Sequence, residues 1–264
     1  MNAIRIAFLN SKGGVGKTTS AVNTAAALAE LGHSVLLLDM DAQSHVASHL
    51  GLEVDPVTSV DAVLQDKRGR IETAIRSTLY PNLDVVLSTG KLEQIEKLLL
   101  LRNQPIDALR RALQGTRRYD FVLIDCAPSL GILSLNAMRA SEYVIIPTDL
   151  DKFSVDGMDR FGNVIAELHE DYADAPSQVL GVLITKFDRR HGIENRANHA
   201  RLETSFADDG VFFRRKIRID ERCKRATREH RPVLTVPGSR AAEDYRALAQ
   251  EILERLDERE ARAA

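Results

Sequence analysis

The stretch from Ser11 to Thr19 reads Ser-Lys-Gly-Gly-Val-Gly-Lys-Thr-Thr, and these residue types could bind phosphate. Its three glycines would let backbone N–H groups turn toward an anion. Lys17 would add a positive charge, and Thr18 would place a hydroxyl where Mg²⁺ could bind. The usual phosphate-loop spacing has a glycine at the position of Ser11, and Lys12 is an additional lysine. We therefore predict a variant phosphate-binding loop rather than a plain glycine-rich turn.

A phosphate loop must lie between a strand and a helix, and the sequence around it predicts both. The apolar run Ile4–Leu9 before the loop is typical of a buried strand. The segment Ala21–Ala29 after it is rich in alanine and leucine, which favour a helix. The positive end of that helix would face the bound anion.

Three aspartates follow predicted strands. Asp39 and Asp41 come directly after the apolar run 34–38, and Asp125 ends the run 119–125. Because the carboxyl ends of parallel strands share one edge of a sheet, these carboxylates would lie beside the phosphate loop. For Asp39 and Asp41 taken alone, an ordinary acidic turn is the alternative. Next to the loop, Asp125 has the pattern of an acid on the Mg²⁺ side of a phosphoryl-transfer site.

A basic stretch lies between residues 214 and 231. It contains nine basic residues against three acidic ones, a net charge of about +6 in a chain that is otherwise acidic. Arg218, Arg222 and Arg225 have a helical spacing and could share a face. A solvated surface is the alternative to a nucleic-acid interface. The nine are Arg214, Arg215, Lys216, Arg218, Arg222, Lys224, Arg225, Arg228 and Arg231.

The composition limits the possible classes of protein. A length of 264 residues with 44% hydrophobic content fits one large domain spanning 1–264. The formal charge of −2 gives no general attraction to nucleic acid. Cys126 and Cys223 are too few for a zinc cluster or a disulfide framework, and Cys126 is expected to fill a buried space. With no signal peptide and no membrane-length apolar run, we expect a soluble cytoplasmic protein.

Strand-like and helical segments alternate along the rest of the chain, and this alternation predicts a doubly wound, mostly parallel α/β sheet with helices on both faces. Residues 44–80 are mixed and polar, with an exposed loop near 66–70 and no recognisable chemistry. Further strands are expected at 83–88, 143–148 and 179–185, with 211–213 closing the sheet, and helices at 92–101, 106–114, 154–170, 193–206 and 241–260.

The motifs together resemble the ParA/Soj partition ATPases, within the deviant Walker-A group that also includes MinD and the nitrogenase iron protein. Residues 12–19 match the deviant loop in full. Asp-Met-Asp-Ala-Gln at 39–43 resembles the family's Asp-x-Asp-Pro-Gln, and Ile-Asp-Cys-Ala-Pro-Ser at 124–129 is similar to Ile-Asp-Cys-Pro-Pro-Ser. Residues 231–233 and 239–245 look like tail motifs of the partition branch. The resemblance covers nearly the whole chain and implies a P-loop NTPase fold that binds ATP and Mg²⁺.

The resemblance also implies roles for individual residues. Lys12 would cross an ATP-sandwiched homodimer to the partner's nucleotide, Lys17 would hold the β- and γ-phosphates, and Asp41 would orient the attacking water. Gly13 would need to stay small at the dimer contact. Thr18 would ligate Mg²⁺, and Asp125 would hold the ion through water. The nucleotide-binding set would be Gly13, Gly14, Val15, Gly16, Lys17, Thr18, Thr19, Thr185, Lys186 and Asp188.

By the same resemblance, Arg222 falls at a DNA-contacting arginine of the family. The ATP-bound dimer would bind double-stranded DNA through phosphates and therefore without sequence preference. A ParB-like activator would stimulate the slow ATPase and release the DNA, which implies a protein associated with the nucleoid. The implied DNA-binding set is Arg214, Arg215, Lys216, Arg218, Arg222, Lys224 and Arg225.

Some positions depart from the family pattern. Ala42 and Ala127 replace prolines, Asp149 stands where glutamine is common, and Ile219 and Glu221 interrupt the arginine motif. No helix-turn-helix domain is expected before the loop, so sequence-specific repression is not predicted.

Two alternative functions use the same loop. One is a membrane-surface positioning ATPase like MinD, against which the mixed charge of the final helix argues. The other is a biosynthetic enzyme or a metallocluster reductase. The reductase would need cluster-binding cysteines that this chain lacks, and the biosynthetic enzyme would need a further substrate domain for which the chain has no spare length.

Overall fold

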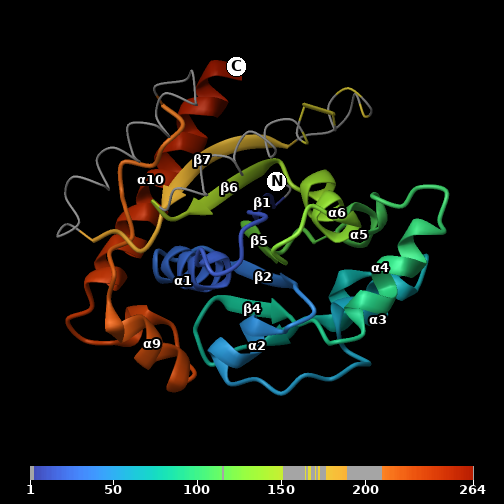
Figure 1. Ribbon diagram of the computed structural model, residues 1–264, viewed down its shortest axis with the longest axis horizontal. Helices are drawn as coiled ribbons and strands as arrows, with labels where there is room; N and C mark the ends of the chain where they lie inside the picture. Colours follow the sequence, from blue (N-terminus) through green and yellow to red (C-terminus); the bar gives the residue numbers. More distant parts are fainter. Residues whose placement is uncertain are drawn as a thin grey trace.

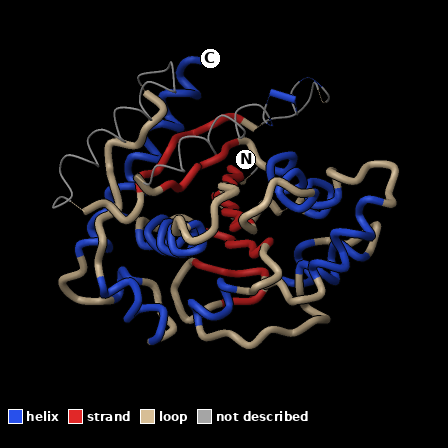
Figure 2. The backbone as a smooth tube through the Cα atoms, in the orientation of Figure 1, coloured by secondary structure: helices blue, strands red, loops and turns tan. Residues whose placement is uncertain are grey.

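The computed structural model describes residues 3–114, 116–150, 177–188 and 210–263, with isolated positions between 164 and 172. Within these ranges the strands form a seven-stranded sheet in the order β3-β4-β2-β5-β1-β6-β7, parallel except for the pair β3 and β4. Figure 1 and Figure 2 show this sheet running between two layers of helices. The strands are β1 (Ile4–Phe8), β2 (Val35–Met40), β3 (Arg76–Ser77), β4 (Leu83–Val86), β5 (Phe121–Cys126), β6 (Tyr143–Thr148) and β7 (Gln178–Ile184).

Helices cover both faces of the sheet, as a doubly wound fold requires. Along β1, Ile6 and Phe8 belong to one apolar cluster and Ala7 to the other, because successive side chains of a strand point to opposite faces. On the face of Ile6 lie α1 (Lys17–Glu30), α2 (His45–Leu50), α9 (Glu221–Arg228), the short 3₁₀ helix η2 (Val233–Thr235) and α10 (Arg240–Ala263). On the opposite face lie α3 (Val60–Gln65), η1 (Ile71–Ala74), α4 (Leu92–Leu100), α5 (Ala108–Ala112) and α6 (Ile132–Ala140).

The central strands β2 and β5 are buried along their whole length. Their nearly continuous apolar sequences suit a sheet that is covered on both sides. Helix α1 packs beside α10, and the Ser20 and Tyr245 hydroxyls are 3.3 Å apart across that contact. These elements fix the loop between β1 and α1 in place.

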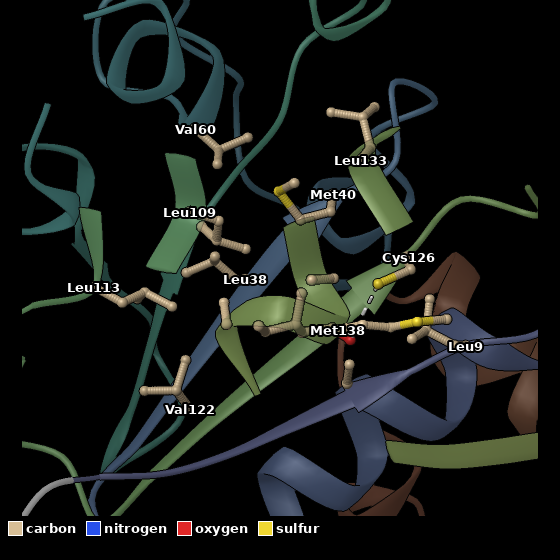
Figure 3. Packing of buried hydrophobic residues seen from close by; sticks show 14 of the residues in the cluster. Leu9, Leu38, Met40, Val60, Leu109, Leu113, Val122, Cys126, Leu133 and Met138 are labelled. Carbon is tan, nitrogen blue, oxygen red and sulfur yellow. Dashed lines mark hydrogen bonds between the residues drawn. The ribbon is translucent and has the colours of Figure 1, made fainter. Parts of the chain in front are cut away.

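Cys126 ends β5 inside the cluster on the α6 face. Figure 3 shows its sulfur among Leu9, Met40 and Met138. Burial raises the pKa of the thiol well above its usual range, so the side chain stays protonated. The expectation of a buried filler is confirmed.

Most of the expected elements that fall on described residues are present, with the following differences. The run 211–213 does pair with the edge strand β7, as expected, but only through an isolated parallel bridge between Phe212 and Val182 and not as a full strand. The helix after the loop begins at Lys17 rather than Ala21. Helices α2 and α3, inside 44–80, and helix α6 were not predicted. The expected helices at 154–170 and 193–206 lie outside the described residues, apart from single positions in the first.

None of the described helices could cross a lipid bilayer, since even the 24-residue α10 is too polar.

Candidate active site

The phosphate loop lies at the carboxyl end of β1 and leads directly into α1 (Figure 1). The Asn10 side chain holds its start, donating to the Pro147 carbonyl at 2.8 Å and accepting the Lys12 N–H at 2.9 Å. Directly after β7, the Thr185 hydroxyl donates to the Val15 carbonyl at 2.7 Å. The loop is therefore attached to the ends of β6 and β7.

The backbone conformation requires glycine at two positions of the loop but not at Gly13. Gly14 and Gly16 have φ of 76° and 86°, in the left-handed region that glycine adopts without a side-chain clash. Gly16 precedes α1 without a side-chain cap, and the first turn of this 14-residue helix has no acidic residue, so its N–H groups can receive an anion. At Gly13, by contrast, a Cβ would meet no described atom within 4 Å. The described part of the protomer does not itself require glycine there.

The two lysines of the loop have different surroundings. Lys17 is 7% exposed, and its ammonium donates to the Lys12 carbonyl at 2.9 Å. Burial lowers the pKa of Lys17, and the charge of Asp125 is the largest influence opposing that shift. The Lys12 ammonium instead pairs with the Asp149 carboxylate, which follows β6, at 2.8 Å.

Asp125 and Asp39 lie side by side, because their strands β5 and β2 are in register. Both side chains are fully buried. Burial raises the pKa of Asp125 to about 7, and the Asp41 charge adds to this shift. Burial and then the Asp125 charge raise the pKa of Asp39 well above its usual range, against hydrogen bonds from the Asp41 and Val46 N–H groups.

The oxygens of Asp125 fit a magnesium site. Both are buried and accept no hydrogen bond of normal geometry from the described residues, although the Thr18 hydroxyl is near enough to lower the pKa of this carboxyl. A carboxylate beside a hydroxyl suits Mg²⁺, which keeps several waters and also takes phosphate oxygens as ligands. Among the described residues, no group of three or more His, Cys, Asp or Glu could hold a metal. The Asp125 carboxylate and the Thr18 hydroxyl nevertheless fit Mg²⁺, whose remaining ligands can be water and phosphate oxygens.

Asp41 follows β2 and is 7% exposed. Its carboxylate accepts the Gln43 N–H at 3.0 Å, and its own N–H donates to Asp39 at 3.0 Å. Its carbonyl accepts the Ser88 hydroxyl at 2.5 Å. Since the Asp41 charge also acts on Asp125, the structure brings the predicted acids together beside the loop.

A pocket of about 490 Å³ opens between the phosphate loop and α9. Its walls also include residues 217–221 and Tyr245 of α10. Asp188, although in the predicted nucleotide set, is not among the described residues that line it. The members of that set that do line the pocket are Gly16, Thr19, Thr185 and Lys186.

Four of the seven predicted DNA-binding residues precede α9 in the sequence, and their side chains contact other residues of the same chain. Arg214, Arg215 and Arg218 form ion pairs with acids of α10. The Arg218 guanidinium donates twice to Asp244 at 2.8 Å. The Lys216 ammonium lies 5.2 Å from the centroid of the Phe187 ring. The expected helical face of Arg218, Arg222 and Arg225 does not form, because α9 begins only at Glu221.

The other three, Arg222, Lys224 and Arg225, lie on α9 and pair with acids on or next to the same helix. Their side chains are 49%, 69% and 65% exposed. The pairs of Lys224 with Glu221 and of Arg225 with Glu229 are exposed on both sides, so they contribute little to stability and can be exchanged for other anions. Arg222 instead lies 3.6 Å from Asp220, whose side chain is 5% exposed. Arg228, which ends α9, is exposed and has no ion pair within the described ranges. The predicted set omitted Arg228, although its spacing of three from Arg225 indicated a shared face.

The loop, the buried aspartates and the parallel sheet define a nucleotide-binding protein of the P-loop class. The model of a family described as an AAA domain matches residues 3–176. The sporulation initiation inhibitor protein Soj of Bacillus subtilis is 35% identical over 94% of this chain and 97% of its own length. The chromosome partitioning protein ParA of Caulobacter vibrioides is 33% identical over 100% of this chain and 99% of its own. The chain therefore belongs to the ParA/Soj family of P-loop ATPases.

A solved structure supports the fold and the type of ligand. Cobyrinic acid a,c-diamide synthase from Mycobacterium smegmatis, solved with ADP and magnesium, has a TM-score of 0.80 and 28% identity to this chain. The similarity covers 97% of this chain and 96% of that one. This fold therefore carries a nucleotide and magnesium in a protein of similar extent.

Proposed function

We propose that this protein is a DNA-partition ATPase whose ATP-bound dimer binds DNA without sequence preference. Hydrolysis, stimulated by a ParB-like partner, would release the DNA, and the protein would work on the nucleoid. The observation that carries this proposal is the convergence of Lys17, Asp41 and Asp125 on the phosphate loop, next to the basic helix α9. The relative named for chromosome partitioning supports the same function.

In this proposal the protein's residues position ATP and a water molecule. The first N–H groups of α1 and the Lys17 ammonium would bind the β- and γ-phosphates, and Thr19 would bind the α-phosphate. Thr18 and, through water, Asp125 would hold Mg²⁺, which would neutralise phosphate charge. Asp41 would orient the attacking water. Phosphoryl transfer depends mainly on such positioning and neutralisation.

Lys12 and Gly13 would face a second protomer in the ATP-bound homodimer. A small residue at 13 would serve that contact, since no described neighbour in the protomer limits its size. Lys12 would leave Asp149 and reach the phosphates bound by the partner. Each chain would act as one domain spanning 1–264.

The base and ribose of ATP would occupy the pocket of about 490 Å³. Thr185 would act mainly through the loop, because its hydroxyl already bonds to the Val15 and Thr148 carbonyls at 2.7 and 3.1 Å. Lys186 lines the pocket with a left-handed φ of 51° and is the more direct candidate. Asp188 would contact the nucleotide from outside the set of residues that line this pocket.

Helix α9 would be the main DNA-contacting surface. Residues 221–228 contain four basic residues against one acidic residue. Exchange of the local carboxylates for DNA phosphates would give binding that is sequence-independent and weakened by salt. The bases held by internal contacts, Arg214, Arg215, Lys216 and Arg218, would contribute at the margin of this surface.

The length of the chain does not exclude the alternative function, a biosynthetic enzyme. The expectation that such an enzyme needs more chain is wrong, because the mycobacterial synthase structure has nearly the same extent as this protein. The higher identity to Soj and ParA, over nearly their full lengths, favours the partition ATPase.

The test is the affinity for random duplex DNA, measured by fluorescence anisotropy with Mg-ATP, with Mg-ADP and without nucleotide. We expect ATP to raise the affinity by roughly tenfold or more, and Arg222→Glu to remove most of that gain. Arg70→Glu, at a 69% exposed arginine outside α9, is the charge-matched control. An ATP effect that is absent, with Arg222→Glu unchanged, would refute the proposal. ATP-dependent sedimentation with anionic liposomes would favour the MinD-like alternative instead.

A further inference from the structure

The backbone around Asp41 is held by two serines that the phosphate-loop motifs do not include. Ser88 follows β4, is fully buried, and donates its hydroxyl to the Asp41 carbonyl at 2.5 Å. The Ser44 N–H donates to the same carbonyl at 3.0 Å. The Ser44 hydroxyl in turn donates to the Ser88 carbonyl at 2.8 Å. These bonds join the loop after β2 to the loop after β4.

The conformation of Ser44 indicates that this contact constrains the loop. Ser44 precedes α2 and has φ of 51° and ψ of 41°, a left-handed conformation that is uncommon for a residue with a side chain. A serine at this position usually caps its helix, yet here the hydroxyl makes no cap bond and points to Ser88 instead. Non-glycine residues are held in such conformations where the surrounding structure fixes them, often at functional sites.

The segment that carries Ser88 is itself anchored on its other side. The carbonyl of Leu87 accepts the Val60 N–H at 2.9 Å. Asp61, 3% exposed, accepts both the N–H and the hydroxyl of Thr89 at 2.9 Å. Helix α3 therefore holds the residues before and after Ser88, which makes Ser88 a rigid support for Asp41.

We propose that Ser88, together with Ser44, is a positioning residue for ATP hydrolysis that aims the Asp41 carboxylate at the water next to the phosphate loop. This inference rests on the proposed function, in which Asp41 orients that water. The serines bond to the Asp41 carbonyl, whereas the carboxylate itself accepts the Gln43 N–H at 3.0 Å, a contact inside the same short loop. Release of the Asp41 carbonyl would let the whole loop shift, and small displacements of catalytic groups are costly.

The test compares Ser88→Ala with Asp41→Ala and with a matched control. The control is Ser141→Ala, because Ser141 is also fully buried and bonds to a single carbonyl, at 2.8 Å, away from the site. We expect Ser88→Ala to lower kcat by roughly tenfold to a hundredfold, with the Kd for a fluorescent ATP analogue within about twofold of the unmodified protein. Ser44→Ala should lower kcat in the same direction.

Hydrogen exchange distinguishes positioning from general loss of structure. Ser88→Ala should speed exchange in the peptide 39–46 and leave β5 unchanged. Turnover of Ser88→Ala equal to that of Ser141→Ala, with Asp41→Ala impaired, would overturn this inference alone. Parallel losses of ATP affinity and of protection in β5 would also overturn it. Absence of hydrolysis by the unmodified protein, or full turnover by Asp41→Ala, would overturn the proposed function and this inference with it.

Discussion

Asp125 is a fully buried carboxylate, and its ionised form is costly to the fold without a bound ligand. Its pKa is raised from 3.8 to about 7, first by burial. The folded protein thus holds this proton more tightly than the unfolded chain, so the free energy of unfolding decreases as pH rises from about 4 to 7. In the proposed function, Mg²⁺ bound with the nucleotide would give the ionised carboxylate its partner.

We therefore expect Asp125→Asn to stabilise the nucleotide-free protein at pH 8 by about 1–3 kcal/mol. The gain should be much smaller at pH 5, where Asp125 is already protonated in the fold. Urea unfolding at the two pH values measures both quantities. The same variant should lose the Mg²⁺-dependent part of ATP affinity. Equal stability changes at pH 5 and pH 8 would contradict the assigned pKa shift.

The ion pair between Lys12 and Asp149 leads to a second prediction, about dimerisation. The side chains are 28% and 19% exposed, so solvent screens the pair only in part. In the proposed dimer, the Asp149 carboxylate would compete with the partner's phosphates for Lys12. Asp149→Asn should therefore lower the protein concentration needed for dimerisation with a non-hydrolysable ATP analogue by a few fold, as measured by sedimentation velocity.

The control for this experiment is Glu30→Gln, which removes an exposed ion pair with Arg246 on the other side of α1. Weaker dimerisation of the Asp149→Asn protein would show that Asp149 supports Lys12 rather than competing for it.

The sequence singled out the candidate residues that belong to local motifs, and it gave no sign of contacts that form only through the sheet. Lys17, Asp41 and Asp125, which the structure brings together, come from short stretches with the pattern of a phosphate loop or of a strand end. The bond between Ser88 and Asp41 joins residues 47 positions apart in sequence. It exists because β2 and β4 are parallel neighbours with Leu38 opposite Val86, and a sequence pattern does not state that pairing.

Helices α2 and α9 meet at their carboxyl ends, and this contact connects the Asp41 loop with the basic helix. The Ser48 carbonyl of α2 lies 2.8 Å from the ring nitrogen Nδ1 of His230, just after α9. Gly51 ends α2 with φ of 65°, and a Cβ there would lie 2.7 Å from the His230 Cβ. A glycine at position 51 is what allows the two helix ends to approach.

Gly51→Ala should destabilise the protein more than Gly32→Ala does. Both glycines have positive φ, which costs alanine about 1–2 kcal/mol, but at Gly32 a Cβ meets nothing described within 4 Å. The clash with His230 should add about 1–3 kcal/mol, measured as the difference in urea unfolding free energy. The Gly51 variant should also bind DNA less tightly, since α9 is displaced. Equal destabilisation of the two variants would show that the helix ends separate freely.

Long, strongly patterned elements were predicted well and short ones were not. The uniformly apolar β2 and β5 and the amphipathic α10 have unambiguous periods. Helices α2 and α3 have six residues each, too few to establish a helical repeat. Residues 44–80 were therefore expected to carry no chemistry, although they contain Ser44, which bonds to the Asp41 carbonyl, and Asp61, which anchors the segment of Ser88.

Within the described part of the chain, α9 gathers four exposed bases on one short helix. Acids of α10 neutralise Arg214, Arg215 and Arg218, which lie ahead of α9. Arg214 and Arg215 stay 74% and 46% exposed in these pairs, and the four bases of α9 add a small cluster of positive charge beside them. Affinity for DNA rises steeply with the number of phosphates neutralised. A single protomer should therefore bind DNA weakly, and the paired clusters of a dimer much more strongly.

A mixing experiment tests whether two protomers must act together. A variant with Arg222, Arg225 and Arg228 all changed to glutamine keeps the nucleotide site but loses most of the α9 charge. Added in fivefold excess with ATP, it should capture the unmodified protein in mixed dimers and reduce DNA binding by several fold in an anisotropy titration. Lys17→Ala, which should not bind ATP and so should not dimerise, is the matched control at the same excess. If the triple variant inhibits no more than Lys17→Ala, each protomer binds DNA independently, and the salt dependence of binding should then correspond to one α9 cluster rather than two.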